Sequence, residues 1–536
     1  MKKGAGESVE EYRGVTLMPT LYKVYIGVLT ERLKEEIEEK SMIPPSQTGF
    51  RKGMGVIDNI YVLNFLNRKL IRKGGMVVTT FVDLKAAFDS VNREVLMEAM
   101  KERGVREELR CRVEEVYRET RNKVRIGEKT GENFLPARGV RQGCPMSPYL
   151  FNLVLADVEE VLRKGGWGGV KLGEEKVYCL AYADDMVLLA ENEEGMVHML
   201  GKLEGYMERK RLEVNVGKTK VMRFRKGGGR MRKMKWRWKG KIIEEVKEFT
   251  YLGYKLQRNG GQEAQVKDRV RKAGAVLRQV WGIGKRRFGG DWEKRIWLCE
   301  RLVGTVMEFG AEIWGWSERR EVEAMQERWI RWTLGVDWCT PGYMVREEIG
   351  KDKFRLGAGK RAVGFEKKLE EGRGGILARK CWEEMKKRVE EGGELSRWEE
   401  KRKEFFEERG KGVREMEMRR RRGEEVYEGW EQRDREMQKE ERWGRIRESR
   451  YNRWYGEVKE EGVPAYLKKG WGESRWKRVM RFRLNNEMRG ARYWEEEEKR
   501  RCRICGGGGD MGTCDRGVYG GRGSGKLVGE NGGGSG

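Results

Sequence analysis

The chain contains only one histidine, His198, among its 536 residues. This argues against catalysis by a histidine base and against zinc sites with two histidine ligands, and we expect His198 to lie on the surface of a helix. The nine cysteines lack the paired framework of secreted proteins, which favours reduced thiols. No signal peptide is visible, and no apolar run approaches the roughly 18 to 20 residues of a membrane helix. We therefore expect an intracellular protein without a membrane partner.

Acidic residues are too few to balance the basic ones, because 88 Asp and Glu face 115 Lys and Arg, a formal net charge of +27. This excess predicts a polyanionic partner, since basic side chains release condensed counterions from a phosphate backbone. Anionic membranes and simple solubility are the competing explanations. Hydrophobic residues make up 38% of the chain and charged residues another 38%. We expect two to four domains with an uneven core.

Two adjacent carboxylates mark the most informative stretch, Val177 to Ala190 (VYCLAYADDMVLLA). Its apolar flanks, rich in β-branched and aromatic residues, predict a tight β-hairpin whose tip carries Asp184 and Asp185. Side chains alternate along a strand, so two neighbouring aspartates can converge on one ligand only where the chain turns. Their repulsion calls for a cation, and oxygen ligands select Mg²⁺ or Mn²⁺ over zinc. An ordinary solvated turn is the alternative.

A third carboxylate, Asp83, lies near the end of a buried-strand pattern, residues 76–84 (MVVTTFVDL), just before a helical stretch. This place suits a residue that faces a ligand. Farther along, residues 138–148 (RGVRQGCPMSP) form a turn-rich loop that leads into an apolar helix predicted over residues 149–162. Gly143 permits close backbone approach there. Arg141 and Gln142 supply hydrogen-bond donors near a helix N-terminus, which favours anions.

A basic loop, residues 47–53 (QTGFRKG), joins two predicted amphipathic helices, one ending after Ile37 and the other running from about Asp58 to Arg72. A loop that contains glycine and arginine can approach phosphates closely. A plain connection between helices is the alternative, and these residues alone favour neither.

These stretches, in this order, resemble the reverse transcriptases. FVDLKAAFDSV, RQGCPMSPYLFNLVL and YADDMVLLA are similar to palm motifs A, B and C of that family. YRGVTL and QTGFRKG resemble its fingers motifs, LEVNVGKTKVM (residues 212–222) resembles motif D, and FTYL (residues 249–252) with the following glycine resembles the primer-grip hairpin. The resemblance is strong over residues 11–256 and weaker to residue 363. Within the family it is greatest to non-LTR retrotransposons of the insect jockey and I kind.

The resemblance implies an α+β right-hand polymerase fold, with fingers and palm built on an antiparallel sheet, a helical thumb, and a charged, mainly helical C-terminal region. It also implies an RNA-directed DNA polymerase that copies retrotransposon RNA from a primer 3′-hydroxyl with two Mg²⁺ or Mn²⁺ ions. Asp83 and Asp184 would bridge both ions, Asp185 would be a partial ligand, and the Leu84 carbonyl would help to bind the ion on the nucleotide side. The implied partners are an RNA template, a DNA primer and deoxynucleoside triphosphates.

Further roles follow from the same resemblance. The residues implied to contact the incoming nucleotide are Phe88, Arg141, Gln142 and Arg13, and those implied to contact template or primer are Arg51, Gly143, Tyr251, Leu252 and Gly253. Phe88 would be a sugar gate, since a bulky ring there collides with a ribose 2′-hydroxyl and favours DNA as product. Core packing is the alternative. Lys218 would protonate the leaving pyrophosphate, and a solvated basic residue is the alternative.

By the same resemblance, residues 1–256 are fingers and palm, and residues 257–363 a thumb-like helical domain with a basic helix over residues 266–280. Tryptophans that recur at helical spacing between residues 292 and 338 favour packing over base stacking. Residues 364–500, rich in Glu, Lys and Arg, are expected to be solvated helices or partly disordered, and a role in RNA binding stays open. Residues 501–536 are expected to form a flexible Gly-rich tail.

Two cysteines in that tail, Cys502 and Cys505, resemble half of a zinc knuckle, and only Cys514 follows them. A tetrahedral site needs four ligands, so we expect no structural zinc. We also recognise no nuclease constellation, and we expect the chain to lack the endonuclease that such elements usually carry. The family implies the nucleus or the cytoplasm as its location, with the nucleus favoured.

Three interpretations of the function follow. The first is the polymerase, the second a maturase-like or telomerase-like host protein, and the third a catalytically inactive remnant that only binds nucleic acid. A host protein of the second kind should carry a dedicated RNA-binding domain, and none is recognisable. The complete set of motif residues argues against the remnant, because decay has no reason to spare them. These residues are Asp83, Phe88, Gln142, Asp184 and Asp185.

Overall fold

The computed structural model describes residues 14–119, 121–227, 234–449 and 452–486. It divides into two compact units, each discontinuous in sequence. The first comprises the described residues within the ranges 1–265, 310–316 and 361–426, and the second those within 266–309, 317–360 and 427–536. Within the described residues, no helix is both long enough and apolar enough to cross a membrane.

The first unit combines helices with β-sheet, which confirms the predicted α+β class. Its strands are β1 (Met76–Val82), β2 (Asn122–Ile126), β3 (Lys129–Phe134), β4 (Val170–Leu172), β5 (Glu175–Val177), β6 (Cys179–Tyr182), β7 (Asp185–Ala190), β8 (Lys220–Arg225), β9 (Trp236–Trp238), β10 (Lys241–Glu245), β11 (Glu248–Tyr251) and β12 (Tyr254–Gln257). Its helices are α1 (Thr20–Glu39), α2 (Val56–Arg72), α3 (Ala87–Ser90), α4 (Arg93–Glu102), α5 (Glu107–Glu119), α6 (Ser147–Val154), α7 (Val158–Lys164), α8 (Glu193–Arg209), α12 (Ala311–Trp314), α16 (Ile376–Glu390), α17 (Arg397–Glu407) and α18 (Val413–Arg421).

The largest sheet in the described part has six strands in the order β6-β7-β1-β8-β10-β9. Neighbouring strands are antiparallel except β8 and β10, which run parallel. The predicted buried strand and the predicted hairpin are confirmed as β1 and as β6–β7. They lie side by side because β7 pairs with both β6 and β1. This arrangement brings two sequence motifs about 100 residues apart to one end of the sheet.

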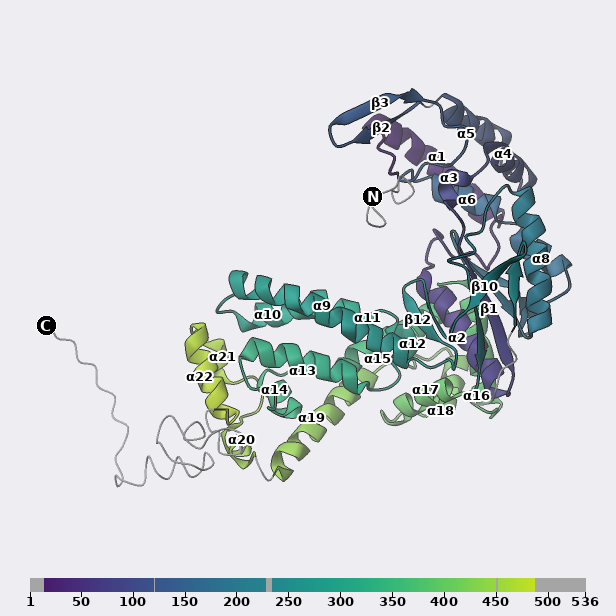
Figure 1. Cartoon of the computed structure of the whole chain (residues 1–536). Helices are drawn as coiled ribbons and strands as arrows, with labels where there is room; N and C mark the ends of the chain where they lie inside the picture. The colour runs from purple at the N-terminus through teal and green to yellow at the C-terminus, as the bar shows by residue number, and fades with distance from the viewer. Residues whose placement is uncertain (1–13, 120, 228–233, 450–451, 487–536) are drawn as a thin grey trace, which may run out of the picture. The chain divides into compact units, whose positions relative to one another are not determined.

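The two faces of β1 are covered by different elements, as its alternating side chains require. Thr80 faces α8, where its hydroxyl donates a hydrogen bond to the Met196 sulfur, 3.1 Å away. Figure 1 shows α8 alongside the sheet. Phe81 points to the other face and stacks on Phe249 of β11, with ring centroids 4.2 Å apart. The β11–β12 hairpin therefore packs on the face opposite α8, which is also the face that Asp83 shares by alternation.

The apolar helix predicted over residues 149–162 is two helices, α6 and α7, separated at residues 155–157. Tyr206 of α8 contacts this break. Its hydroxyl group lies 3.3 Å from the Val154 carbonyl and 2.6 Å from a carboxylate oxygen of Asp157. The hydroxyl replaces the backbone N–H that would bond the Val154 carbonyl in a continuous helix. The sequence of residues 149–162 alone does not reveal this break. The predicted helix N-terminus is confirmed. Strands β2 and β3 form a separate antiparallel hairpin.

The charged stretch after residue 363 differs from the solvated helices that the sequence predicts. Residues up to 426 belong to the first unit, and Trp382, Phe405 and Phe406 are buried there. Charged side chains are internal as well, because the Arg402 guanidinium makes two hydrogen bonds, of 2.6 and 2.9 Å, to the buried carboxylate of Glu366. A buried pair of this kind satisfies its own charges, so a high fraction of Arg and Glu does not prevent packing.

The second unit is helical throughout its described part. Its elements are α10 (Trp292–Cys299), a π-helical turn η2 (Glu300–Gly304), α11 (Thr305–Glu308), α13 (Arg320–Leu334), α14 (Gly342–Glu348), α19 (Trp430–Glu448), α20 (Arg453–Val458), α21 (Ala465–Lys468) and α22 (Glu473–Arg483), while residues of α9 (Glu263–Arg287) and α15 (Phe354–Glu370) are divided between the units. The basic helix predicted over residues 266–280 is confirmed as part of α9.

The tryptophan side chains predicted to pack are largely buried. Trp292 and Trp329 are buried in the second unit, and Trp314 and Trp316 in the first. Trp297 and Trp338 differ, with 52% and 82% of their surface exposed. His198 is exposed on α8, as predicted, and stacks on Trp167.

Candidate catalytic site

A cavity of about 430 Å³ lies where β1 ends and β7 begins. Five of the residues singled out from the sequence line it, and they come from four separate segments of the chain. These residues are Asp83, Asp185, Lys218, Tyr251 and Leu252. The antiparallel sheet explains their meeting, because it places the C-terminal end of one strand beside the N-terminal start of the next.

Two carboxylates face each other across this end of the sheet. Val82 of β1 and Met186 of β7 are the last pair of the register. Continuing that register by one step sets Asp83 opposite Asp185, and both residues line the cavity. Side chains of directly opposed residues point to the same face, with Cβ atoms about 4.5–5.5 Å apart. Asp184 occupies the two-residue turn between Tyr182 and Asp185. Asp185 lines the cavity, while Asp184 is half-buried at the hairpin tip.

Backbone hydrogen bonds fix the end of β1. The Asp83 carbonyl accepts from the Asn215 N–H at 2.8 Å, and the Asp83 N–H donates to the hydroxyl of buried Thr219 at 3.2 Å. Leu84 forms an isolated antiparallel bridge with Val214, flanked by the hydrogen bond from the Lys85 N–H to the Glu213 carbonyl. In this pattern the Leu84 carbonyl points away from Val214.

The donor atoms at this end of the sheet fit a hard divalent cation, which prefers oxygen ligands. Within the described residues, no three Asp, Glu, His or Cys side chains gather closely enough to hold a metal ion by themselves. Mg²⁺ commonly binds proteins through one or two carboxylates and takes its other ligands from water and substrate phosphates. Asp83 and Asp185 meet that description.

The cavity also has a cationic and an aromatic wall. Lys218 is exposed on the loop before β8, whose Thr219 is the partner of Asp83. Tyr251 ends β11, and its hydroxyl accepts a 3.4 Å hydrogen bond from the Asn59 amide. Burial raises the pKa of this hydroxyl well above its ordinary range, and the negative charge of Asp185 raises it further. Tyr251 therefore stays neutral beside the carboxylates.

The tip of the β11–β12 hairpin is a two-residue turn between Tyr251 and Tyr254. Leu252 and Gly253 have φ angles of +46° and +78°, as a type I′ turn requires. Leucine is rarely found in this region of backbone space, because its Cβ collides with the backbone. The turn nevertheless presents the Leu252 side chain to the cavity.

Two of the remaining predicted residues are packed against aromatic rings outside this cavity. The Phe88 ring is stacked on Phe151, with centroids 5.0 Å apart and planes within 11°. Arg141 is buried, with its guanidinium over the rings of Tyr22 and Tyr117 at 5.3 and 4.9 Å. It donates to the Tyr22 hydroxyl and, at 2.8 Å, to the Val116 carbonyl. Burial lowers the pKa of Arg141.

The other predicted contacts also lie away from the cavity. Gln142 donates from its amide to Asp89 at 3.1 Å, and the exposed Gly143 has a φ angle of +102°. Arg51 makes two hydrogen bonds, of 2.9 and 3.2 Å, to Glu38. Arg13 and the three C-terminal cysteines lie outside the residues that the structure describes.

Two residues of the 47–53 loop contact the tip of the β6–β7 hairpin. The sequence did not predict this contact. Gln47 hydrogen-bonds the backbone of Ala183, and Gly49 lies directly against it. The spacing of glutamine and glycine in QTG is the only feature of the local sequence that could have indicated this contact. It does not predict a partner 136 residues away.

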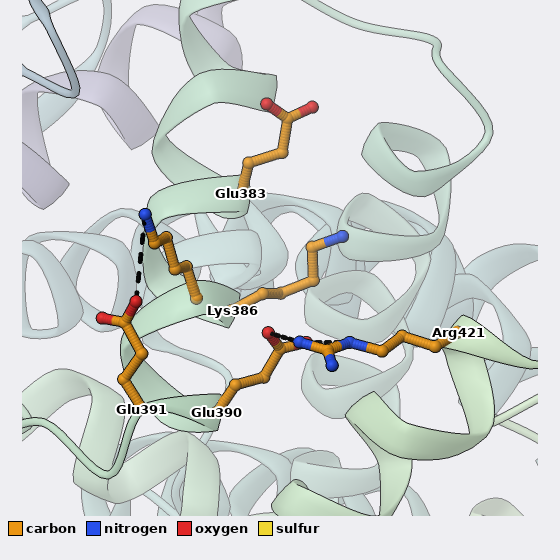
Figure 2. A pocket seen from close by; sticks show the side chains of 6 residues that line it. Glu383, Lys386, Glu390, Glu391 and Arg421 are labelled. Carbon is orange, nitrogen blue, oxygen red and sulfur yellow. Dashed lines mark hydrogen bonds and ion pairs between the residues drawn. The ribbon is translucent and has the colours of Figure 1, made fainter.

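A second cavity, of about 530 Å³, lies between α16 and α18 and is lined by charged side chains. Figure 2 shows Arg421 of α18 reaching Glu390 of α16. Lys387 forms an ion pair with Glu391, with 3.8 Å between the charged atoms. Because these carboxylates are neutralised by cations of the chain itself, the cavity does not offer the converging carboxylates that a metal or a proton-transfer site needs.

Comparison with known proteins associates residues 1–256 with one family, whose description is reverse transcriptase (RNA-dependent DNA polymerase). The retrovirus-related Pol polyprotein from the type-1 retrotransposable element R2 of Nasonia vitripennis is 31% identical over 222 residues, 41% of this chain and 21% of that protein. The RNA-directed DNA polymerase from mobile element jockey of Drosophila melanogaster is 23% identical over 356 residues, 64% of this chain and 37% of that protein. The chain thus spans well under half the length of either relative.

Among solved structures, telomerase from Candida tropicalis in complex with a fragment of telomeric RNA is similar. The sequences are 12% identical, the similarity covers 72% of this chain and 56% of that one, and the TM-score is 0.36.

Proposed function

We propose that the protein is an RNA-directed DNA polymerase of a non-LTR retrotransposon, because residues 1–256 match the reverse transcriptase family. It extends a primer 3′-hydroxyl along an RNA template with deoxynucleoside triphosphates. The main support is the meeting of Asp83 and Asp185, on paired strands, with Lys218 in one cavity. The family match adds the reaction, and the relatives add the retrotransposon origin.

Reverse transcriptases in general use divalent metal ions. For this chain we propose two Mg²⁺ ions, or Mn²⁺, held by the carboxylates of Asp83, Asp184 and Asp185 and by the Leu84 carbonyl. When bound, such ions activate the attacking hydroxyl and neutralise charge on the leaving pyrophosphate. Opposed carboxylates, and a carbonyl directed away from Val214, support this ligand set.

The remaining chemistry is positioning and proton transfer by the chain's own residues. Lys218 is an exposed basic residue at the cavity and would donate a proton to the departing pyrophosphate. The turn of Leu252 and Gly253 would press on the primer strand, and the neutral Tyr251 hydroxyl, held by Asn59, keeps that turn in place.

On the nucleotide side, Phe88 would exclude the ribose 2′-hydroxyl, and its stacking on Phe151 would hold the ring in position. Gln142 and Gly143 lie on the surface of their loop and would contact nucleotide or template. Arg141 is buried between two tyrosine rings, which supports a role in holding this loop rather than direct contact. Nuclear location, Arg13 as a nucleotide contact and Arg51 as a template contact stay predictions.

Primer extension tests the proposal. Purified chain is mixed with a DNA primer annealed to an RNA template, Mg²⁺, and either deoxynucleotides or ribonucleotides. We expect extension with deoxynucleotides and a loss of at least 1,000-fold, on the order expected when a metal-binding carboxylate is removed, in Asp83→Asn and Asp184→Asn. Asp291→Asn is the matched control, because Asp291 caps α10 by accepting from the Lys294 N–H and asparagine caps equally well.

Binding of the same primer-template is measured in parallel. Tight, salt-sensitive binding by a wild-type chain that extends nothing would contradict the proposal and leave a protein that only binds nucleic acid.

A further inference from the structure

The start of the 47–53 loop pairs with the outer edge of strand β6. The Ala181 N–H donates to the Ser46 carbonyl at 2.8 Å, and the Thr48 N–H donates to the Ala181 carbonyl at 3.0 Å. Gln47 and Ala181 thus form a parallel bridge. β6 ends the sheet order, so the loop covers backbone groups that an edge strand would otherwise leave open.

The side chain of Gln47 extends this pairing to the hairpin tip. Its amide oxygen accepts from the Ala183 N–H at 2.9 Å, and its amide nitrogen donates to the Ala183 carbonyl at 3.2 Å. The same oxygen also accepts from the Gly49 N–H at 2.9 Å. Gln47 is only 3% exposed, so these hydrogen bonds form away from water, where an amide that loses its partner is costly.

Ala183 needs such support because its φ angle is +56°. Asp184 is not among the residues with positive φ, and a two-residue hairpin turn with positive φ at its first position alone normally has glycine there. A side chain there costs about 1–2 kcal/mol and persists only where the surroundings fix the conformation. The reciprocal hydrogen bonds of Gln47 hold both backbone polar groups of this one residue.

Gly49 lets the loop come this close. A Cβ atom at residue 49 would lie 2.4 Å from the Ala183 nitrogen and 3.0 Å from the Tyr182 carbonyl carbon. Both atoms are backbone, so neither can move aside as a flexible side chain would. The contact therefore depends on glycine because of space, not because of its φ angle.

We propose that Gln47 is a positioning residue for Asp184. By fixing the peptide groups on both sides of the Ala183 Cα, it sets the direction in which the next residue's carboxylate leaves the turn. The inference rests on the proposed function, since it concerns the geometry of the same carboxylates. It assigns the 47–53 loop a role that differs from both sequence interpretations, a phosphate contact and a plain connection.

Gln47→Met is the main test, because methionine has a similar length but neither donates nor accepts. A displacement of about 1 Å at a reacting group costs up to roughly 100-fold in rate. We expect kcat to fall about 10- to 100-fold, with a several-fold higher Mg²⁺ concentration at half-maximal rate and little change in primer-template affinity. Gly49→Ala should lower kcat in the same way, because its new methyl group displaces the tip.

A second substitution separates positioning from general stability. Glycine adopts positive φ without strain, so Ala183→Gly should allow the turn to keep its shape without the hydrogen bonds from Gln47. In the Gln47→Met background we expect Ala183→Gly to restore kcat at least fivefold. A purely structural role for Gln47 would give no such rescue.

The matched control is Gln326→Met in the second unit. Gln326 is likewise buried and donates a 3.1 Å hydrogen bond to the Asp352 carbonyl. We expect its melting temperature to fall about as much as that of Gln47→Met, while kcat and the Mg²⁺ requirement stay at wild-type values.

Hydrogen exchange provides a readout that needs no activity. In Gln47→Met, a peptide covering residues 179–186 should lose protection at the Ala183 amide, and in Gln326→Met it should not. Unchanged protection, or an equal loss of kcat in both variants, would overturn the inference. A wild-type chain that extends no primer would count against the proposed function. The hydrogen-exchange comparison of the two variants would still decide whether Gln47 fixes the turn at Ala183.

Discussion

Backbone strain gathers around the proposed catalytic site. Eight non-glycine residues of the described chain have a positive φ angle. Three of them, Ala86, Ala183 and Leu252, lie within a few residues of the aspartates or on the wall of the cavity. Such residues persist where the fold forces them, and they cluster at functional sites. At Ala183 and Leu252 the strain lies in hairpin turns next to the aspartates or the cavity.

Phe88 offers a prediction about sugar selection. Replacing its ring with the smaller Phe88→Val side chain removes the bulk that would meet a 2′-hydroxyl. We expect the ratio of kcat/KM for deoxynucleotides over ribonucleotides to fall on the order of 10- to 100-fold. Phe151→Leu keeps the Phe88 ring but removes the partner that holds it in position, so we expect a smaller fall in this ratio than in Phe88→Val. A loss of stability in both variants with no change in this ratio would mean that Phe88 only packs.

The sequence predicts the place of a residue best when its contacts come from nearby in the chain. Asp83, Asp185 and Lys218 were predicted from short motifs, and the structure brings all three to one cavity. The role of Gln47 was missed, because its partner Ala183 is 136 residues away. The sandwich of Arg141 between Tyr22 and Tyr117 was missed for the same reason.

Among the helices and strands, the β11–β12 hairpin illustrates a conflict between stability and function. Leu252→Asn places a residue that tolerates positive φ at the strained turn position. We expect the free energy of unfolding to rise by up to about 1 kcal/mol, measured by urea denaturation. Primer extension should become less processive, since the apolar side chain at the cavity is lost. Unchanged processivity would contradict a primer contact by this turn.

Helix α16 is tied to the sheet region through Glu384. Its carboxylate contacts Lys69 of α2 at 2.7 Å and Arg388 at 2.8 Å, and accepts from the Gly173 N–H at 3.1 Å. Burial by itself would raise the pKa of Glu384, but the hydrogen bonds from Lys69 and Gly173 outweigh it and lower the pKa below 4.5. The folded state therefore favours the ionised form.

We expect Glu384→Gln to reduce the free energy of unfolding by roughly 1–3 kcal/mol at pH 7, as for lost hydrogen bonds to a charged group. A lowered carboxyl pKa stabilises the fold above the unfolded pKa, and this contribution disappears as the pH falls through the folded pKa. The difference between wild type and variant should thus shrink below about pH 4.5. Exposed Glu383 provides the control Glu383→Gln, and a difference that stays constant with pH would refute this account.

Across the chain as a whole, the order of elements in sequence is a poor guide to what packs together. The helices over residues 361–426 belong to the same compact unit as the sheet, although residues 266–309 and 317–360 of the second unit lie between them in sequence. Tyr61 of α2 packs against Phe365 and Trp398, with ring centroids 5.1 and 5.6 Å away. Composition could not predict this, because the few apolar residues that make these contacts are dispersed among Glu, Lys and Arg.

Trp398 therefore gives the test of whether this charged stretch is part of the proposed polymerase. It is 3% exposed, and its indole N–H donates to the Ile313 carbonyl at 2.6 Å. Trp398→Ala should destabilise the first unit by about 3–5 kcal/mol, through the cavity left by the ring and the lost hydrogen bond. Primer extension should then fail at a lower temperature than in wild type.

Trp338 provides the control, because it is 82% exposed in the second unit. We expect Trp338→Ala to change stability by less than about 0.5 kcal/mol. If residues 361–426 were instead solvated helices independent of the sheet, both variants would melt and extend primers like the wild type.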